Sequence, residues 1–160
     1  MKINKPLLIL CIAIPLLGGV VSALLSGGGM EVFASVDKPP LAPPAWLFPV
    51  AWTVLYTLMG ISSYLIRTSE ASVEAIRDAM NIYALQLLVN FLWPTFFFNF
   101  RWYLFAFFWL VLLWLFVLLM IWRFKDISKL AAILNIPYLI WLTFAGYLNF
   151  SIWLLNRSVL

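Results

Sequence analysis

The sequence predicts an all-α membrane protein, a bundle of five transmembrane helices. Its 160 residues are 66% hydrophobic and only 10% charged, with a mean hydropathy of +1.05, far outside the composition of a soluble globular domain. The chain contains five apolar runs of about 20 residues or more, the length that an α-helix needs to cross a hydrocarbon core of roughly 30 Å. Strands of a β-barrel would instead alternate polar and apolar residues over about ten positions. A multi-pass integral membrane protein is therefore expected.

We place the five spans in a single domain covering residues 1–160, at residues 7–26, 45–66, 79–100, 103–122 and 130–156. The first run follows Lys2 and Lys5 and ends near small residues, features that it shares with a secretory signal peptide. It is longer than the apolar region of such a peptide, and four further spans follow it. We therefore predict a membrane helix there. The last run is long enough to tilt or to emerge from the bilayer.

The loops between the predicted spans differ in composition. The first begins at the "SGGG" of residues 26–29 and runs through a proline-rich stretch to about Pro44. The second, "RTSEASVEAIRDAM", carries charges of both signs and is interpreted as a solvated turn. The third is only "RW", which predicts that the third and fourth spans form a tight antiparallel hairpin. In the first span Gly18, Ser22 and Ser26 repeat every four residues, a pattern that lets membrane helices pack closely.

The positive charges predict the orientation of the bundle, because cytoplasmic loops of membrane proteins carry an excess of lysine and arginine. Seven of the ten cations lie in the amino terminus and the second and fourth loops, and three lie in the first and third loops and the tail. The amino terminus is therefore predicted to be cytoplasmic, with the proline-rich loop outside. Because the cations lie between apolar spans rather than along one face, no nucleic-acid partner is expected.

The sequence lacks the usual groups of acid–base and metal chemistry. It has no histidine, and its one cysteine, Cys11, lies inside the first span. The six acidic residues are confined to loops. We therefore predict no catalytic residue, no metal site and no cofactor, and we expect that the protein is not an enzyme.

Three of the predicted spans each carry a tryptophan and polar groups along one face. Amides inside the hydrocarbon need partners, so these faces should point into the bundle. Helix–helix hydrogen bonding and core packing explain each face taken alone. Their occurrence on three helices favours a cavity for a large, flat and mainly apolar ligand. The residues are Phe48, Trp52 and Tyr56 in the second span, Gln86, Asn90 and Trp93 in the third, and Tyr138, Trp141, Ala145, Leu148 and Asn149 in the fifth.

The motifs "KPPLAPPAWLFPVAWTVLYTLMG", "QLLVNFLWPTFFF" and "PYLIWLTFAGYLN" resemble the translocator protein family, also called tryptophan-rich sensory proteins or peripheral-type benzodiazepine receptors. The resemblance implies a five-helix bundle whose first loop covers a pocket for tetrapyrroles, sterols and synthetic isoquinoline carboxamides. It also implies membrane lipid as a partner, a homodimer, and a prokaryotic cell membrane as the location. Carried over by motif, the pocket residues are Trp52, Asn90, Trp93, Trp141, Ala145 and Leu148.

The same resemblance implies that the first loop is a lid, stiffened by Pro39, Pro40, Pro43 and Pro44. The sequence departs from the family at several places. Val32 and Phe33 stand where a Trp-Tyr pair is usual, and Leu41 replaces a tryptophan. Phe150 replaces the tyrosine of the sterol motif of animal members, so no sterol ligand is predicted. Asn81 and Leu85 stand where a glycine pair is expected for dimer contacts.

Three functions are compatible with these features. The first is a membrane receptor or carrier for porphyrin-like ligands, in tetrapyrrole or stress signalling. The second is light-dependent degradation of porphyrin beside Trp52 and Trp141. The third is a scaffold or regulator whose ligand tunes a partner interaction. The stacked tryptophans favour the first.

Overall fold

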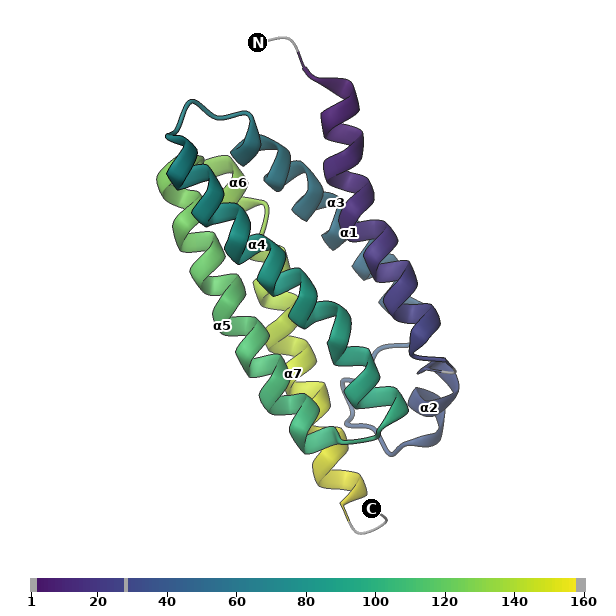
Figure 1. Ribbon diagram of the computed structural model, residues 1–160. Helices are drawn as coiled ribbons and strands as arrows, with labels where there is room; N and C mark the ends of the chain where they lie inside the picture. The colour runs from purple at the N-terminus through teal and green to yellow at the C-terminus, as the bar shows by residue number, and fades with distance from the viewer. Residues whose placement is uncertain (1–2, 28, 158–160) are drawn as a thin grey trace.

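The computed structural model describes residues 3–27 and 29–157, which form a bundle of long helices (Figure 1). Within this part of the chain, five segments are long and apolar enough to cross a membrane, and no strand occurs. The predicted fold class is confirmed. The long helices are α1 (Lys5–Leu25), α3 (Leu47–Arg67), α4 (Val73–Pro94), α5 (Tyr103–Ile127) and α7 (Ile136–Asn156). The shorter elements are α2 (Gly29–Ser35), the π-helical turn η1 (Thr95–Asn99) that extends α4, and α6 (Lys129–Ile133).

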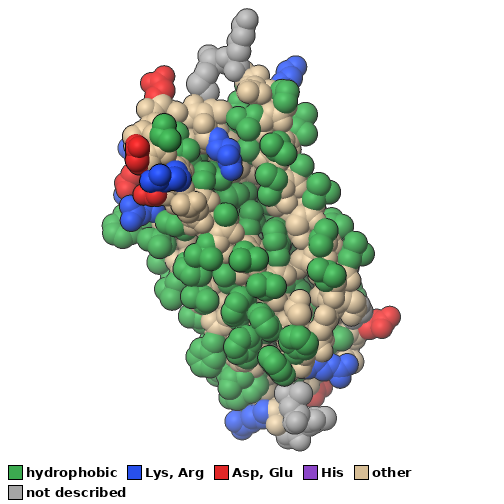
Figure 2. Space-filling model, viewed as in Figure 1, with side chains coloured by type: hydrophobic (Ala, Val, Ile, Leu, Met, Phe, Trp, Pro, Cys, Tyr) green, Lys and Arg blue, Asp and Glu red, His purple; other side chains and the backbone are tan. Residues whose placement is uncertain are grey.

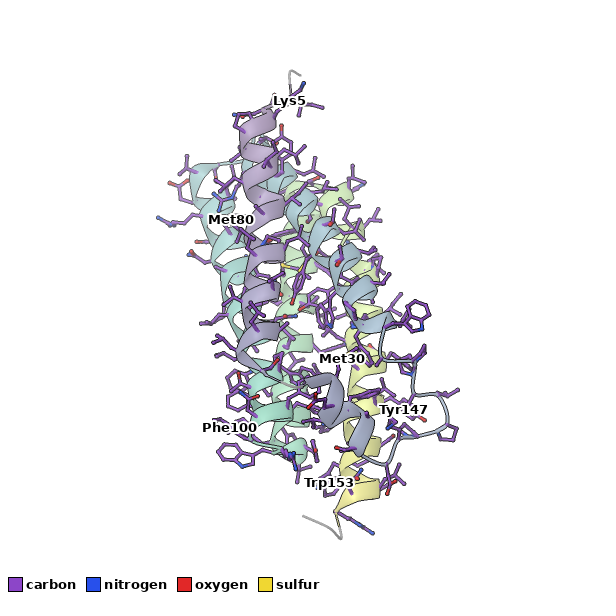
Figure 3. The ribbon with its side chains drawn as sticks, turned by 90° about the vertical axis from the view of Figure 1, so that its right-hand side faces the viewer. Lys5, Met30, Met80, Phe100, Tyr147 and Trp153 are labelled. Carbon is purple, nitrogen blue, oxygen red and sulfur yellow. The ribbon has the colours of Figure 1, made fainter. Side chains whose placement is uncertain are left out.

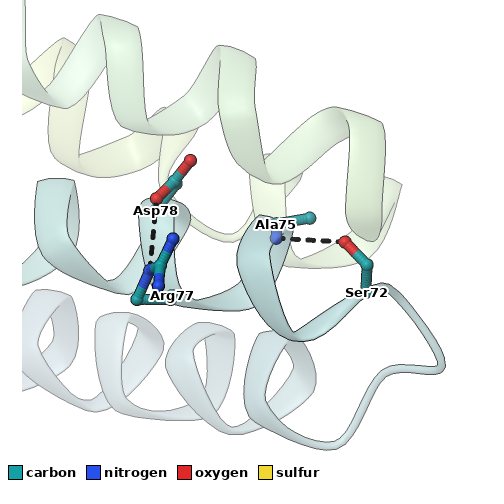
Figure 4. A network of polar contacts seen from close by, with 4 residues as sticks. All are labelled: Ser72, Ala75, Arg77 and Asp78. Atoms are coloured by element: carbon teal, nitrogen blue, oxygen red, sulfur yellow. Dashed lines mark hydrogen bonds and ion pairs between the residues drawn. The ribbon is translucent and has the colours of Figure 1, made fainter.

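The helix α4 begins at Val73, six residues before the predicted start of the third span. The hydroxyl of Ser72 accepts a hydrogen bond from the backbone N–H of Ala75 at 3.2 Å (Figure 4). Glu74 lies in the first turn of α4, where a negative charge is favourable. The interpretation of residues 67–80 as a solvated turn was therefore wrong for most of that segment. The exposed pair of Arg77 and Asp78, at 3.7 Å, adds little to stability.

Two other elements differ from the sequence prediction. The first loop contains the short helix α2, which hydrophobic periodicity did not indicate. The fifth span is not one helix over residues 130–156, because it breaks at Leu134 and Asn135 between α6 and α7. At this break the fully buried Asn135 amide donates to the Ser62 hydroxyl at 2.7 Å and to the carbonyl of Ala131 at 2.9 Å. Pro137, which has no N–H to donate, lies in the first turn of α7.

The charged side chains gather at the two ends of the bundle, with hydrophobic side chains between them (Figure 2). The end with the start of α1 has more of the charged residues, and we call it the charged end. We call the end with α2 the lid end (Figure 1). The cations Lys5, Arg67, Arg77, Arg123, Lys125 and Lys129 belong to segments at the charged end, whereas Lys38, Arg101 and Arg157 belong to segments at the lid end. This separation matches the pattern used to predict orientation. That the charged end faces the cytoplasm stays a prediction.

The helix α5 packs against both α4 and α7 and contributes to the core that these helices share with α3 and α6. Its buried side chains recur every three or four residues and form one stripe, while the other side chains of this very apolar helix are exposed or only partly buried. The helix α1 lies at the outside, against α3 and α4. The buried stripe consists of Tyr103, Ala106, Leu110, Leu113, Val117, Met120 and Phe124.

Candidate functional site: a cavity beneath the lid

A cavity of about 410 Å³ lies in the half of the bundle nearer the lid end. The helices α1, α3, α4 and α7 form its sides, Leu110 and Leu113 of α5 close its back, and α2 lies across its lid end. None of the described residues that line it is charged. Its size is typical of small-molecule sites, and its lining suits an apolar ligand.

The α3 wall is aromatic and follows the predicted face. Phe48, Trp52 and Tyr56 all line the cavity. The rings of Trp52 and Tyr56 are stacked, with centroids 5.2 Å apart at an angle of 27°. No described residue accepts a hydrogen bond from the indole N–H of Trp52. This wall therefore offers a ring face and a free donor to a ligand.

A chain of hydrogen bonds forms the deep end of the cavity. The Tyr56 hydroxyl donates to the Asn90 side-chain oxygen at 2.7 Å, and the Asn90 amide nitrogen donates to the Tyr138 hydroxyl at 2.6 Å. Tyr138 donates in turn to Gln86 at 3.3 Å, and Gln86 contacts the Met59 sulfur at 3.9 Å. Of the residues in this series of hydrogen bonds, only Tyr56 and Asn90 line the cavity. Gln86 and Tyr138 lie behind them and join helices.

Trp93 of α4 and Asn149 of α7 line another part of the cavity, together with Ala145 and Leu148 of α7. The Trp93 indole N–H donates to the Asn149 side-chain oxygen at 3.2 Å and to the Ala106 carbonyl at 3.1 Å. The Asn149 amide donates to the Tyr103 carbonyl at 2.7 Å. Because its N–H is already paired within the bundle, Trp93 offers a ligand its ring surface rather than a donor.

The structure brings most of the predicted site residues together. Gln86, Tyr138 and Trp141 are the exceptions, because they do not line the cavity. Trp141 packs edge-on against Trp52 and Phe48, with ring centroids 6.5 and 6.0 Å away. It therefore contacts two rings of the α3 wall without lining the cavity itself. The predicted residues that do line the cavity are Phe48, Trp52, Tyr56, Asn90, Trp93, Ala145, Leu148 and Asn149.

The cavity is covered at the lid end by α2 and not by the prolines of the first loop. Gly29, Met30 and Phe33 line the cavity, whereas none of Pro39, Pro40, Pro43 and Pro44 does. The prolines shape the return of the chain to α3, where turns are closed by hydrogen bonds from Ala42 N–H to the Pro39 carbonyl and from Leu47 N–H to the Pro44 carbonyl, both at 3.0 Å. Figure 3 shows Met30 at this end of the bundle, far from Lys5 and Met80.

The helix α1 forms a wall of the cavity that the sequence pattern did not predict. The small residues there were interpreted as a packing signal, and they do allow close approach, since the Ser22 hydroxyl donates to the Phe91 carbonyl of α4 at 2.6 Å. The same four-residue spacing also placed them on the cavity face. The missed residues are Leu16, Gly19, Val20, Ser22, Ala23 and Ser26.

No group of three or more His, Cys, Asp or Glu side chains able to hold a metal ion occurs within residues 3–27 and 29–157. The described residues that line the cavity offer aromatic faces and amide, hydroxyl and indole groups. These bind by stacking, burial and hydrogen bonding.

Comparison with known proteins places this arrangement in a family. Residues 11–154 match the model of the TspO/MBR family. The chain is 39% identical over 138 residues to "Protein CrtK" of Rhodobacter capsulatus, covering 86% of this chain and 85% of the relative. It is 34% identical over 156 residues to "Tryptophan-rich protein TspO" of Chlorobaculum tepidum, covering 96% and 99%. It is 37% identical over 147 residues to "Translocator protein" of Bos taurus, covering 90% and 86%.

Proposed function

Because this chain belongs to the TspO/MBR family of membrane proteins, we propose that it is a receptor or carrier that binds porphyrin-like tetrapyrroles between its spans. Synthetic isoquinoline carboxamides, which are also flat and aromatic, would occupy the same place. The observation that carries the proposal is the uncharged cavity of about 410 Å³, whose lining includes Trp52 of α3 and Trp93 of α4.

The chemistry of the cavity suits a flat ring held without metal ligation. The chain has no histidine to serve as an axial ligand, so a porphyrin would be held by stacking and by removal of its apolar surface from lipid and water. Its free polar edge would meet the N–H of Trp52 or the amide of Asn90. Its charged propionates would lie outside the cavity, at the lid end.

Of the two cations Arg101 and Lys38, Arg101 is the more available to bind those propionates. The Lys38 ammonium already donates to the carbonyls of Phe33, Ala34 and Val36 at 2.8 to 3.2 Å. Arg101 is exposed between η1 and α5, at the same end. Arg101 therefore has donors available to a carboxylate.

Titration of the purified protein with protoporphyrin, followed by quenching of tryptophan fluorescence, tests the proposal. Replacement Trp52→Leu should weaken binding by about 1 to 3 kcal/mol, as expected for one lost stacking contact. Trp141→Leu should weaken it less, because Trp141 acts only through the rings in front of it. Trp114→Leu is the control, since Trp114 points to Thr143 on the outer face. Wild-type affinity in both Trp52→Leu and Asn90→Leu would refute the proposal.

The pair of Trp52 and Trp141 also favours a second candidate, light-dependent degradation of the bound porphyrin. The two indoles are 6.5 Å apart, and Trp52 lines the cavity. Among the described residues that line the cavity there is no histidine, carboxylate or lysine to act as a general base, so pigment should be stable in darkness. Replacing both tryptophans with Phe should slow loss under light more than it weakens binding. Absorbance of the bound pigment decides this, and steady loss in darkness would contradict it.

A further inference from the structure

The lid segment, which we define as residues 29–46, is fastened to the last turn of α7 by Asn156. The backbone N–H of Asp37 donates to the Asn156 side-chain oxygen at 3.1 Å, and the Asn156 amide donates back to the Asp37 carbonyl at 3.0 Å. The same amide donates to the Ile152 carbonyl at 2.7 Å, which fixes the side chain on its own helix. One side chain therefore satisfies both backbone groups of a residue that lies 119 positions away in the sequence.

The next residue, Lys38, fastens the other side of the lid segment. Its ammonium donates to the carbonyls of Phe33, Ala34 and Val36, at 2.9, 3.2 and 2.8 Å. Carbonyls at the end of a helix lack intrahelical partners and carry partial negative charge, so a cation there stabilises the end of α2. The ammonium also lies 5.3 Å from the centre of the Phe33 ring. Residues 37 and 38 thus join α7 to α2 directly.

Phe33 is the side chain that this arrangement positions over the cavity. It lines the cavity, is buried, and meets Phe48 edge-on with ring centroids 5.0 Å apart. It belongs to a separate apolar cluster at the lid end that includes Phe97, Tyr103 and Ile152. If the hydrogen bonds between Asp37 and Asn156 open, the neighbouring Lys38, which contacts the carbonyl and the ring of Phe33, moves as well.

We propose that Asn156 is a positioning residue that latches the lid segment shut, so that a ligand enters and leaves the cavity when the contact between Asn156 and Asp37 opens. The inference rests on the proposed function, since it concerns passage of the ligand of that cavity. Asn156 does not itself line the cavity, so its loss removes no ligand contact. A latch of this kind acts on the rates of entry and release together, and leaves their ratio nearly unchanged.

The hydrogen bonds of Asn156 with Asp37 are strong enough to shift the opening equilibrium of the lid segment and weak enough to let it open. Two neutral hydrogen bonds at a solvent-accessible position change an opening equilibrium by about 5- to 100-fold. The protein offers a matched control in Asn99, whose amide donates to the Leu25 carbonyl at 3.0 Å at the same end of the bundle. Asn99 joins η1 to α1 and makes no hydrogen bond to the lid segment.

The first measurement needs no ligand. Amide hydrogen exchange of the full-length protein in lipid nanodiscs is compared for wild type, Asn156→Ala and Asn99→Ala. The Asp37 amide and its neighbours in the lid segment should exchange about 5- to 100-fold faster in Asn156→Ala, and at the wild-type rate in Asn99→Ala. Lys38→Met, which keeps the apolar stem of the side chain, should accelerate exchange in α2 by a smaller factor.

The second measurement is the kinetics of protoporphyrin binding by stopped-flow fluorescence. In Asn156→Ala the association and dissociation rates should rise by similar factors, with the dissociation constant within about threefold of wild type. A merely structural role would instead lower affinity through faster release alone. The proposal would be overturned by that outcome, or by hydrogen exchange in the lid segment that is unchanged in Asn156→Ala or equally accelerated in Asn99→Ala. It would also be overturned if hydrogen exchange became faster while the rates of protoporphyrin binding and release did not change. If wild type does not bind protoporphyrin, the proposed function fails, and exchange alone decides whether Asn156 holds the lid.

Discussion

The helices α1 and α3 meet in two different ways along their length. Toward the charged end their backbones touch: a Cβ atom on Gly60 would lie 2.5 Å from the Cα of Ile12 and 2.8 Å from the Cys11 carbonyl oxygen. Toward the lid end Gly19 of α1 faces the side-chain ring of Tyr56 and not the backbone of α3, and residues of both helices line the cavity. We call these the packed half and the cavity half.

The polar groups of the two halves differ in the same way. In the packed half, Ser62 and Asn135 pair with each other and with the Ala131 carbonyl, and both are fully buried. In the cavity half, Asn90 lies at the surface of a hollow and Trp52 has no acceptor among the described residues. The difference shows that polar side chains join neighbouring helices in the packed half, whereas in the cavity half polar side chains border an unfilled space.

The largest effect on stability is expected for the replacement Gly60→Ala, in the packed half. Both nearest obstacles to the new Cβ are backbone atoms, which cannot turn aside, so the free energy of unfolding should fall by about 2 to 3 kcal/mol. Unfolding in detergent, followed by circular dichroism, measures this. The control is Gly146→Ala, where the nearest atom to the new Cβ is Leu110 Cδ2 at 3.9 Å. This replacement should be neutral or slightly stabilising, because alanine is more favourable than glycine inside a helix by about 1 kcal/mol. Equal effects would show that α1 and α3 do not depend on backbone contact.

The sequence predicted the fold and one side of the comparison well, for a physical reason. Crossing a bilayer requires long apolar runs, and a polar group inside them must face a partner, so hydropathy and periodicity together indicate both the spans and their inner faces. Trp52, Asn90 and Trp93 were located in this way. Boundaries were predicted less well, since the start of α4 depends on the cap by Ser72 and the break before α7 depends on Asn135.

The predicted residues that do not line the cavity show what a periodic pattern lacks. Gln86 and Tyr138 share helix faces with lining residues but lie at least one turn nearer the charged end. Trp141 instead packs against the lining rings of Phe48 and Trp52. A face of a helix is set by periodicity, whereas depth along it is set by how closely neighbouring helices approach. The contacts of the lid segment were missed for a similar reason, because the pairing of Asn156 with Asp37 joins residues far apart in sequence.

A smaller effect is expected at the boundary between the halves, where Asn90 pairs with Tyr56 and Tyr138. Replacement Asn90→Leu leaves the Tyr56 hydroxyl without its acceptor, while Tyr138 can still donate to Gln86. The free energy of unfolding should fall by about 1 to 2 kcal/mol. Tyr56→Phe, which removes one hydroxyl beside the cavity and leaves the Asn90 bond to Tyr138 intact, should cost about half as much. A larger loss in Tyr56→Phe would mean that the cavity half carries the stability.

The smallest effect on stability, and the sharpest contrast with Gly60, is expected for Gly19→Ala. The new Cβ would overlap the edge of the Tyr56 ring, so something must move. Here the obstacle is a side chain beside open space, and the ring can turn into the cavity, so the free energy of unfolding should change by less than about 1 kcal/mol. The displaced ring would take up room meant for the ligand and disturb its stack with Trp52, so protoporphyrin affinity should fall about tenfold. Gly18→Ala is the matched control, because its Cβ would meet the ring of Phe91, which does not line the cavity. It should leave affinity near wild type. Fluorescence titration and unfolding of the two variants, measured side by side, would separate the halves: a loss of stability without a loss of affinity in Gly19→Ala would show that the space beside Tyr56 serves packing rather than binding.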